Sequence, residues 1–171
     1  GALNFNMIFT ISPTVSAHLP TIVKINQEAL PAVSSVTLKD MEHFLSTVDY
    51  FRTLQLDDIV AGFLIALTPG KDYNSPNYQW FEKKFNSFMY VDRIVIDLAY
   101  QSNGFGWAFY NNLREFTEDR SPRITCEVNL RPPNEGSIIF HEKYGFRQVD
   151  TQETDGGKKE VSLMEYKIPS I

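Results

Sequence analysis

DRIVIDLAYQSNGFG, the stretch from Asp92 to Gly106, decides the fold, and it runs directly into WAFYNNLREF. Its apolar run Ile94–Ile96 is typical of a buried strand. After Gly104 and Gly106, apolar side chains recur at helical spacing, at Trp107, Phe109, Tyr110, Leu113 and Phe116. A strand, a glycine turn and a helix present unpaired backbone N–H groups, and the positive end of the helix dipole, to a phosphate. The stretch therefore predicts a binding site for a phosphate-bearing cofactor.

The spacing of the two glycines argues against two common phosphate-binding motifs. The dinucleotide fingerprint needs a third glycine three residues after Gly106, where this chain has Phe109. The nucleoside-triphosphate loop needs a lysine directly after its last glycine, and none follows here. What remains is Gln101-x-x-Gly104-x-Gly106, for which an ordinary strand-to-helix turn is the alternative interpretation.

Length and composition limit the classes of protein to consider. A chain of 171 residues, 43% of them hydrophobic, suffices for one well-cored domain, so we expect a single domain over residues 1–171. The net charge of −5, with no basic run, argues against a nucleic-acid partner and favours a cationic substrate such as an amine. Cys126 is the only cysteine, and the three histidines lack zinc-ligand spacing, so we expect no disulfide and no metal.

The sequence also carries signals about location. Residues 1–12 lack a basic region followed by a sustained apolar run, and no apolar segment approaches eighteen residues. We therefore expect a cytoplasmic protein without a membrane partner, either a monomer or a homodimer.

Apolar periodicity and turn residues predict eleven elements. Seven strands are expected at 5–12, 51–56, 59–67, 88–98, 123–129, 146–153 and 159–168. Four helices are expected at 14–30, 38–47, 105–119 and 134–144. The order β-α-α-β-β-β-α-β-α-β-β contains a βαβ unit after antiparallel strands. It predicts an α/β (α+β) fold with a mixed sheet and helices on both faces.

Two motifs in this order resemble those of the GNAT superfamily of acyl-CoA-dependent N-acyltransferases. Gln101-x-x-Gly104-x-Gly106 is similar to its Q/R-x-x-G-x-G/A motif. About thirty residues later, the segment NEGSIIFHEKYGF, residues 134–146, looks like N-x-x-A-x-x-(L/F)-Y-x-x-x-G-F. The resemblance covers residues 88–148, whereas residues 1–67 agree only in element order. The strings YNSPNYQWF, YVDRI and CEVNLRPPN further resemble a subgroup of predicted acetyltransferases.

The resemblance implies acetyl-CoA as co-substrate. Its pyrophosphate would bind backbone N–H groups of the loop Gln101, Ser102, Asn103, Gly104, Phe105 and Gly106. Its pantetheine arm would pair with the main chain of Ile94, Val95 and Ile96, in an opening between strands 88–98 and 123–129. Asn134 and Ser137, at the start of the last helix, are expected near the cofactor, and N-capping is the alternative role of Asn134.

Transfer to an amine needs a base, because an ammonium with a pKa of about 10.4 is neutral in only about one molecule in two thousand at pH 7. Asp92 is the candidate, since it shares strand parity with Tyr90 and lies where several GNAT enzymes place a base. An ion pair with Arg93 or Arg123 is the alternative role of Asp92. Glu127 and Asp97 are weaker candidates for the base.

The departing CoA thiolate needs a proton donor. The resemblance implies a tyrosine, but the aligned residue is His141, whose imidazolium could donate a proton only near or below pH 6.5. Tyr144, one turn later, is the substitute.

The segment 68–87 is long for a simple connection and rich in aromatic residues. We expect it to form a wall of the acceptor pocket. The end of the first helix, residues 26–33, is the other expected wall. The expected substrate-binding residues are Asn26, Tyr73, Tyr78, Trp80 and Tyr90. A short helix over 78–86, packing these rings on the sheet, is the alternative.

These observations predict an N-acetyltransferase in which a small-molecule amine attacks acetyl-CoA directly. A non-catalytic acyl-CoA-binding module and a protein or peptide N-acetyltransferase are the alternatives.

Overall fold

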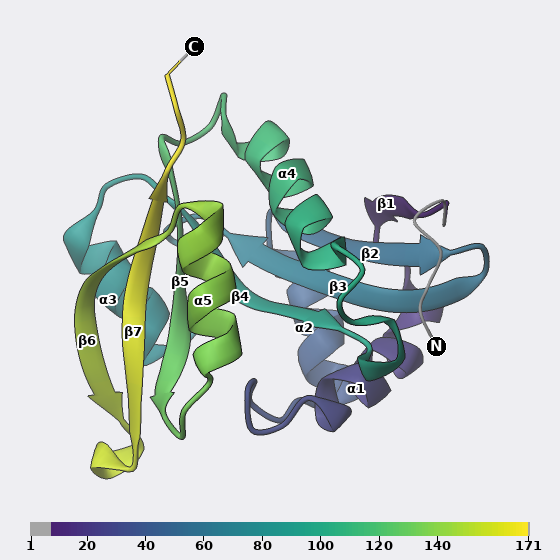
Figure 1. Ribbon diagram of the computed structural model, residues 1–171, viewed down its shortest axis with the longest axis horizontal. Helices are drawn as coiled ribbons and strands as arrows, with labels where there is room; N and C mark the ends of the chain where they lie inside the picture. The colour runs from purple at the N-terminus through teal and green to yellow at the C-terminus, as the bar shows by residue number, and fades with distance from the viewer. Residues whose placement is uncertain (1–7, 171) are drawn as a thin grey trace. The chain divides into compact units, whose positions relative to one another are not determined.

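The computed structural model describes residues 8–170, and Figure 1 shows its elements. The strands are β1 (Thr10–Pro13), β2 (Tyr50–Leu56), β3 (Ile59–Leu67), β4 (Met89–Ile96), β5 (Arg123–Arg131), β6 (Arg147–Thr154) and β7 (Lys159–Lys167). The α-helices are α1 (Leu19–Glu28), α2 (Leu38–Thr47), α3 (Pro76–Lys84), α4 (Phe105–Thr117) and α5 (Glu135–Tyr144). Short 3-10 turns are η1 (Ser16–His18), η2 (Leu98–Tyr100) and η3 (Asp155–Gly157).

The described chain divides into two compact units. Unit 1 comprises the described residues up to Ala66 together with Arg93–Leu113, and unit 2 comprises Leu67–Asp92 with the described residues from Arg114 onward. The strands are hydrogen-bonded in the order β1-β2-β3-β4-β5-β7-β6. Strand β4 runs through both units, so its second half belongs to unit 1 and its first half to unit 2. The predicted α/β class with a mixed sheet is confirmed.

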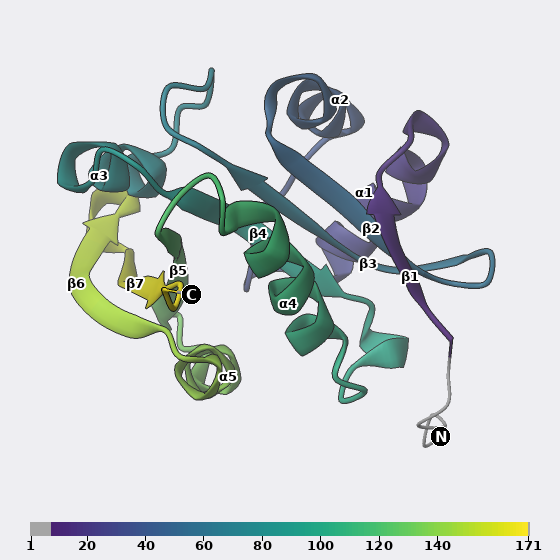
Figure 2. The same ribbon diagram turned by 90° about the horizontal axis from the view of Figure 1, so that it is seen from above.

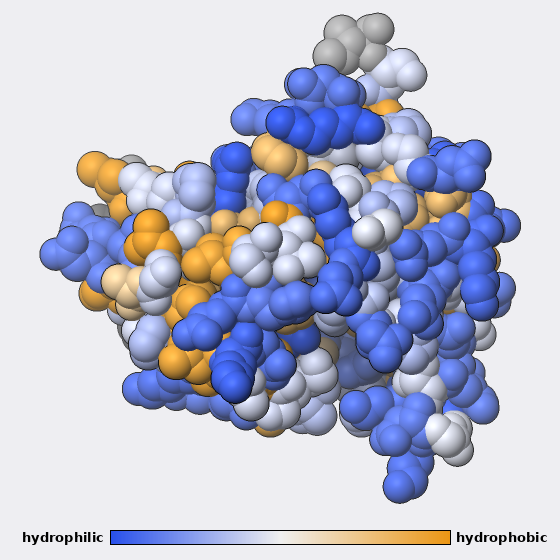
Figure 3. All heavy atoms as spheres, turned by 180° about the vertical axis from the view of Figure 1, so that it is seen from behind, coloured by the Kyte–Doolittle hydropathy of each residue, from blue (hydrophilic) through white to orange (hydrophobic). Residues whose placement is uncertain are grey.

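In unit 1, β1, β2 and β3 pair antiparallel, and β2 and β3 turn at Asp57, which has a positive φ of 53°. Helices α1 and α2 cover one face of these strands and α4 the other (Figure 2). Helix α2 begins at its predicted residue because Thr37 and Asp40 form a capping box. On the face drawn in Figure 3, exposed hydrophobic side chains gather on the side of α1 and α2, among hydrophilic ones.

Two predicted boundaries in unit 1 are corrected. Strand β1 begins at Thr10 rather than at residue 5, and residues 5–7 of the prediction lie outside the described part. Helix α1 begins at Leu19, after a 3-10 turn, rather than at residue 14. Pro20 explains the start, because a proline in the first helical turn costs no hydrogen bond.

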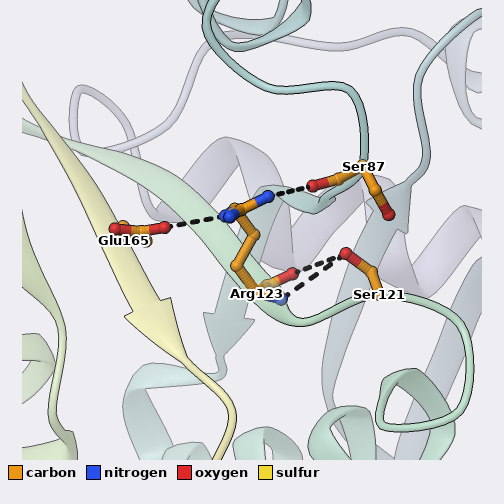
Figure 4. A network of polar contacts seen from close by, with 4 residues as sticks. All are labelled: Ser87, Ser121, Arg123 and Glu165. Carbon is orange, nitrogen blue, oxygen red and sulfur yellow. Dashed lines mark hydrogen bonds and ion pairs between the residues drawn. The ribbon is translucent and has the colours of Figure 1, made fainter.

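In unit 2, β4 and β5 pair in parallel from Met89–Ile124 to Val91–Cys126, and β7 pairs antiparallel with both β5 and β6. Helices α3 and α5 lie on opposite faces of these strands (Figure 2). Arg123 joins the strands to the chain before β4 (Figure 4): its Nε donates to Glu165 at 2.7 Å and its Nη1 to the Ser87 carbonyl at 2.7 Å. Its guanidinium also lies 4.1 Å from the ring centroid of Phe85.

Helix α3 was expected only as an alternative for the segment 68–87. The described residues therefore contain five α-helices where the main prediction had four. Ser75 caps α3 by accepting from the Tyr78 N–H, and Pro76 occupies its first turn. The helix buries Tyr78 and Phe81, whose rings pack against Phe88 and Tyr90. The packing alternative for these rings is thus confirmed.

Candidate active site

The loop between β4 and α4 is braced by its own side chains. Asp97 caps η2 by accepting from the Ala99 N–H at 3.0 Å. Asn103 Nδ2 donates to the carbonyls of Tyr100 and Gln101, both at 2.9 Å. The first bond uses the Ala99 amide and the other two use carbonyls of the loop, so together they fix the loop's course without using the first amides of α4.

Gly104 is the position at which this loop requires a glycine. Its φ is +77°, a left-handed conformation that other residues adopt at a cost, and a Cβ built there meets no heavy atom within 4 Å. The chain then enters α4 at Phe105, where Ala108 N–H donates to the Gly104 carbonyl at 3.0 Å. The first amides of a helix have no intrahelical acceptor. An open, side-chain-free position directly before these amides fits a phosphate group.

The remaining predicted cofactor residues in unit 1 contribute differently. Phe105 is buried and its ring packs edge-on against Phe9, which leaves its backbone for binding. Along β4, Val95 is buried while Ile94 and Ile96 are half-buried. Gln101 Nε2 donates to the Ile96 carbonyl at 3.2 Å. One main-chain acceptor expected to receive pantetheine is therefore occupied by the loop's own glutamine. Ser102, with a φ of +65°, lies in the loop, whereas Gly106 lies in the first turn of α4.

Asn26 lies inside unit 1 rather than on an acceptor surface. Its side chain is completely buried, donates to Ser34 and Gln27, and accepts from Arg93 Nη1 at 2.9 Å. Arg93 also donates to the Ser34 carbonyl and hydroxyl. These bonds use both ends of the Asn26 amide, so the side chain ties the end of α1 to Ser34 and Arg93.

Unit 2 contains two tyrosine–carboxylate pairs, whose carboxylates belong to Asp92 of β4 and Glu127 of β5. The Tyr73 hydroxyl donates to Asp92 Oδ1, and the Tyr90 hydroxyl donates to Glu127 Oε2 at 2.6 Å. Asp92 is half-buried. Burial, together with the charges of Glu127 and Asp92, raises the pKa of Tyr90 well above its ordinary value, so Tyr90 stays protonated. Tyr90 is completely buried, and its hydroxyl supports the Glu127 carboxylate.

The alternative role of Asp92 is an ion pair with Arg93 or Arg123. Arg123 donates to Glu165 and Ser87, and Arg93 to Asn26 and Ser34. The Asp92 carboxylate accepts a hydrogen bond from the Tyr73 hydroxyl. Sequence reasoning grouped Tyr73 with the acceptor wall and missed this pairing, for which the sequence contains no local signal.

His141 and Tyr144 differ in their ability to donate a proton. His141 is buried, its Nδ1 lies 2.7 Å from the Ser137 carbonyl, and burial lowers its pKa. Near neutral pH its Nδ1–H therefore donates to that carbonyl, and Nε2 can only accept. Burial raises the pKa of Tyr144 to about 12, so its hydroxyl keeps its proton. These environments favour Tyr144 over His141 as the acid.

The remaining predicted residues of unit 2 lie on α5, on α3 and in the segment before α3. Asn134 caps α5 by accepting from the Ser137 N–H at 3.4 Å, which confirms its alternative role. The Tyr78 hydroxyl donates to the Thr68 carbonyl at 2.6 Å and accepts from the Lys71 N–H at 3.0 Å. Trp80 is half-buried and packs edge-on against Phe81. Within residues 8–170, no group of three or more His, Cys, Asp or Glu side chains could hold a metal ion.

Comparison with known proteins identifies the family of this chain. A model of the acetyltransferase (GNAT) family matches residues 20–146. The chain belongs to this family. The matched range includes the β4–α4 loop, both tyrosine–carboxylate pairs and α5, so the elements singled out above are GNAT elements. No curated protein sequence matches the chain.

Solved structures agree with the GNAT fold. The ribosomal-protein-S18-alanine N-acetyltransferase of Escherichia coli is 20% identical with a TM-score of 0.71, and 96% of each chain is covered. The Salmonella typhimurium protein yncA, solved with its cofactor acetyl-CoA, is 14% identical with a TM-score of 0.70, again with 96% of each chain covered. Arabidopsis thaliana Naa50, in complex with the bisubstrate analogue CoA-Ac-MVNAL, is 14% identical with a TM-score of 0.70, covering 93% of this chain and 98% of that one. At these identities the likeness concerns the fold.

Each helix in residues 8–170 is too short or too polar to cross a membrane.

Proposed function

We propose that this GNAT protein is an acetyl-CoA-dependent N-acetyltransferase that acetylates an amine by direct attack. The open turn at Gly104, in left-handed conformation before the first amides of α4, carries the proposal. This turn would bind the pyrophosphate of acetyl-CoA. The presence of acetyl-CoA in the similar yncA structure supports this choice of cofactor. The family match runs through both units, which supports residues 1–171 acting as one acetyltransferase domain.

Asp92 is the proposed base. Removing a proton from a lysine-like ammonium at pH 7 costs about 4–5 kcal/mol, so a carboxylate that accepts the proton, directly or through water, speeds the reaction. The neutral amine then attacks the thioester carbonyl carbon. The resulting tetrahedral species collapses, the carbon–sulfur bond breaks, and the acetamide forms.

Tyr144 is the proposed acid. The departing CoA thiolate takes the phenolic proton, which the high pKa of Tyr144 retains throughout the neutral range. We expect no acetyl-enzyme, since Cys126 is buried in β5 and acetyl transfer needs an accessible thiolate.

The proposed acceptor is a small-molecule amine, with Trp80 and the exposed part of α3 as candidates for its contacts. A peptide amino terminus is the second candidate. The names of the Escherichia coli enzyme and the Naa50 complex support it, because both refer to protein or peptide acceptors.

The test has two steps. Calorimetry with acetyl-CoA should show binding, and a panel of small amines and peptides, assayed for CoA release, should identify an acceptor. Binding without turnover on any member would favour a non-catalytic acyl-CoA-binding module, whereas absence of binding would refute the proposal.

A further inference from the structure

The Tyr73–Asp92 pair joins the proposed base to a loop outside the strands. Tyr73 lies in residues 68–75, between β3 and α3, and both partners belong to unit 2. Its hydroxyl donates to one carboxylate oxygen of Asp92. That bond restricts rotation of the carboxyl group, so the loop helps to set the direction of the carboxylate.

Helix α3 holds this loop at three points. The Tyr78 hydroxyl donates to the Thr68 carbonyl at 2.6 Å and accepts from the Lys71 N–H at 3.0 Å. Glu82 Oε2 accepts from the Gly70 N–H at 2.9 Å. The backbone on the amino-terminal side of Tyr73 is therefore bonded to side chains of one helix.

The ring of Tyr73 is held by the same helix. Its centroid lies 5.7 Å from that of Tyr78, which in turn lies 5.5 Å from that of Tyr90. Helix α3 is itself fixed, because Tyr78 and Phe81 are completely buried and Asn77 accepts from Gln152 of β6 at 3.0 Å. The hydroxyl of Tyr73 thus has a defined position relative to β4.

We propose that Tyr73 is a positioning residue for Asp92 and that α3 is the element that holds it there. This inference rests on the proposed function, since it assumes that Asp92 is the base. A hydrogen bond donated to a carboxylate stabilises and orients it, and an oriented base transfers a proton faster than a freely rotating one. Tyr73 acts only through Asp92, so its removal has no further effect once Asp92 cannot act as a base.

A double-mutant cycle on an identified acceptor tests this. Tyr73→Phe removes the hydroxyl and keeps the ring. We expect kcat to fall about tenfold, with unchanged acetyl-CoA affinity and melting temperature, because a hydrogen bond to a charged group typically contributes that much. Asp92→Asn should lower kcat further. In the Asp92→Asn background, Tyr73→Phe should change kcat less than twofold. A tenfold loss in both backgrounds would mean that Tyr73 contacts substrate directly and would overturn the inference.

Two exposed residues of α3 test the role of the helix. Glu82→Ala removes the bond to Gly70 and should lower kcat by a few-fold, while Lys83→Ala, the matched change at the next exposed position, should not. Equal effects of the two would refute the role of α3.

The outcomes separate the two proposals. Unchanged kcat in Asp92→Asn would overturn the base assignment and the inference together. A large loss in Asp92→Asn with none in Tyr73→Phe would overturn the inference alone.

Discussion

Replacing Gly104 by valine separates cofactor binding from fold stability. The backbone there has a φ of +77°, and a Cβ would meet no heavy atom within 4 Å. The valine therefore causes strain but no collision in the free protein. Gly156, in the turn between β6 and β7, offers a matched control: its φ is +62°, and a Cβ there also meets no heavy atom within 4 Å.

The two substitutions should cost similar stability. A non-glycine residue in the left-handed region costs about 1–2 kcal/mol, and somewhat more for a β-branched side chain. For a chain of this size, that lowers the melting temperature by roughly 2–8 °C. Only at Gly104 does the added side chain also occupy the space proposed for the pyrophosphate. Losing even one or two charge-assisted bonds from backbone N–H groups costs about 3 kcal/mol, which is about a hundredfold in Kd.

Calorimetry and thermal melts on both variants decide the matter. Gly156→Val should melt lower than the wild type yet bind acetyl-CoA with unchanged Kd. Gly104→Val should show a similar melting temperature and at least a hundredfold weaker Kd. If folded Gly104→Val binds acetyl-CoA as well as Gly156→Val does, the pyrophosphate does not lie on this loop.

Three further predictions concern the acid, pH dependence and stability. Tyr144→Phe should lower kcat at least tenfold on an identified acceptor. The kcat of the wild type should show no alkaline decline below pH 10, because the pKa of Tyr144 is raised to about 12. A decline of kcat near pH 6 would instead assign the acid to His141. Burial lowers the pKa of His141 from 6.5, so as the pH falls this histidine is protonated first in the unfolded chain. The free energy of unfolding should therefore fall as the pH drops below about 6.5. In urea melts of His141→Asn, the free energy of unfolding should depend less on pH over that range. Arg123→Met leaves the carboxylate of Glu165, 8% exposed, without its arginine, and should cost about 3 kcal/mol in denaturant melts, whereas a cost below 1 kcal/mol would show that the pair is unimportant.

The sequence predicted most elements because local signals and the hydrophobic pattern agree there. Strand β3 and helix α2 match their predicted residues, since a capping box starts the helix and a two-aspartate turn starts the strand. At the amino-terminal end of the chain the signals conflict. Apolar periodicity extends the first helix back to residue 14, whereas Pro20 favours a start at Leu19, and the proline decides.

Helix α3 shows a different limit of the sequence. Its surface is largely charged or polar, and its apolar residues are aromatic rings close together in the chain. Ser75-Pro76 is a recognisable start signal for a helix. The rings become a core only where Phe88 and Tyr90 provide a surface to cover, and no signal within the segment 68–87 indicates that surface.

The candidate site was located by motif, but its chemistry depends on contacts between distant residues. Aligning the last helix with the GNAT pattern puts His141 where the family has tyrosine, which makes a histidine acid the direct interpretation. Two features of the fold reverse this. Burial lowers the pKa of His141, which favours the neutral imidazole, and the Ser137 carbonyl accepts the N–H that the neutral ring retains. The Tyr73–Asp92 and Tyr90–Glu127 bonds span 19 and 37 residues, and the second depends on the parallel register of β4 and β5. A motif can therefore indicate where the reaction occurs, whereas the protonation states that permit it depend on the folded environment.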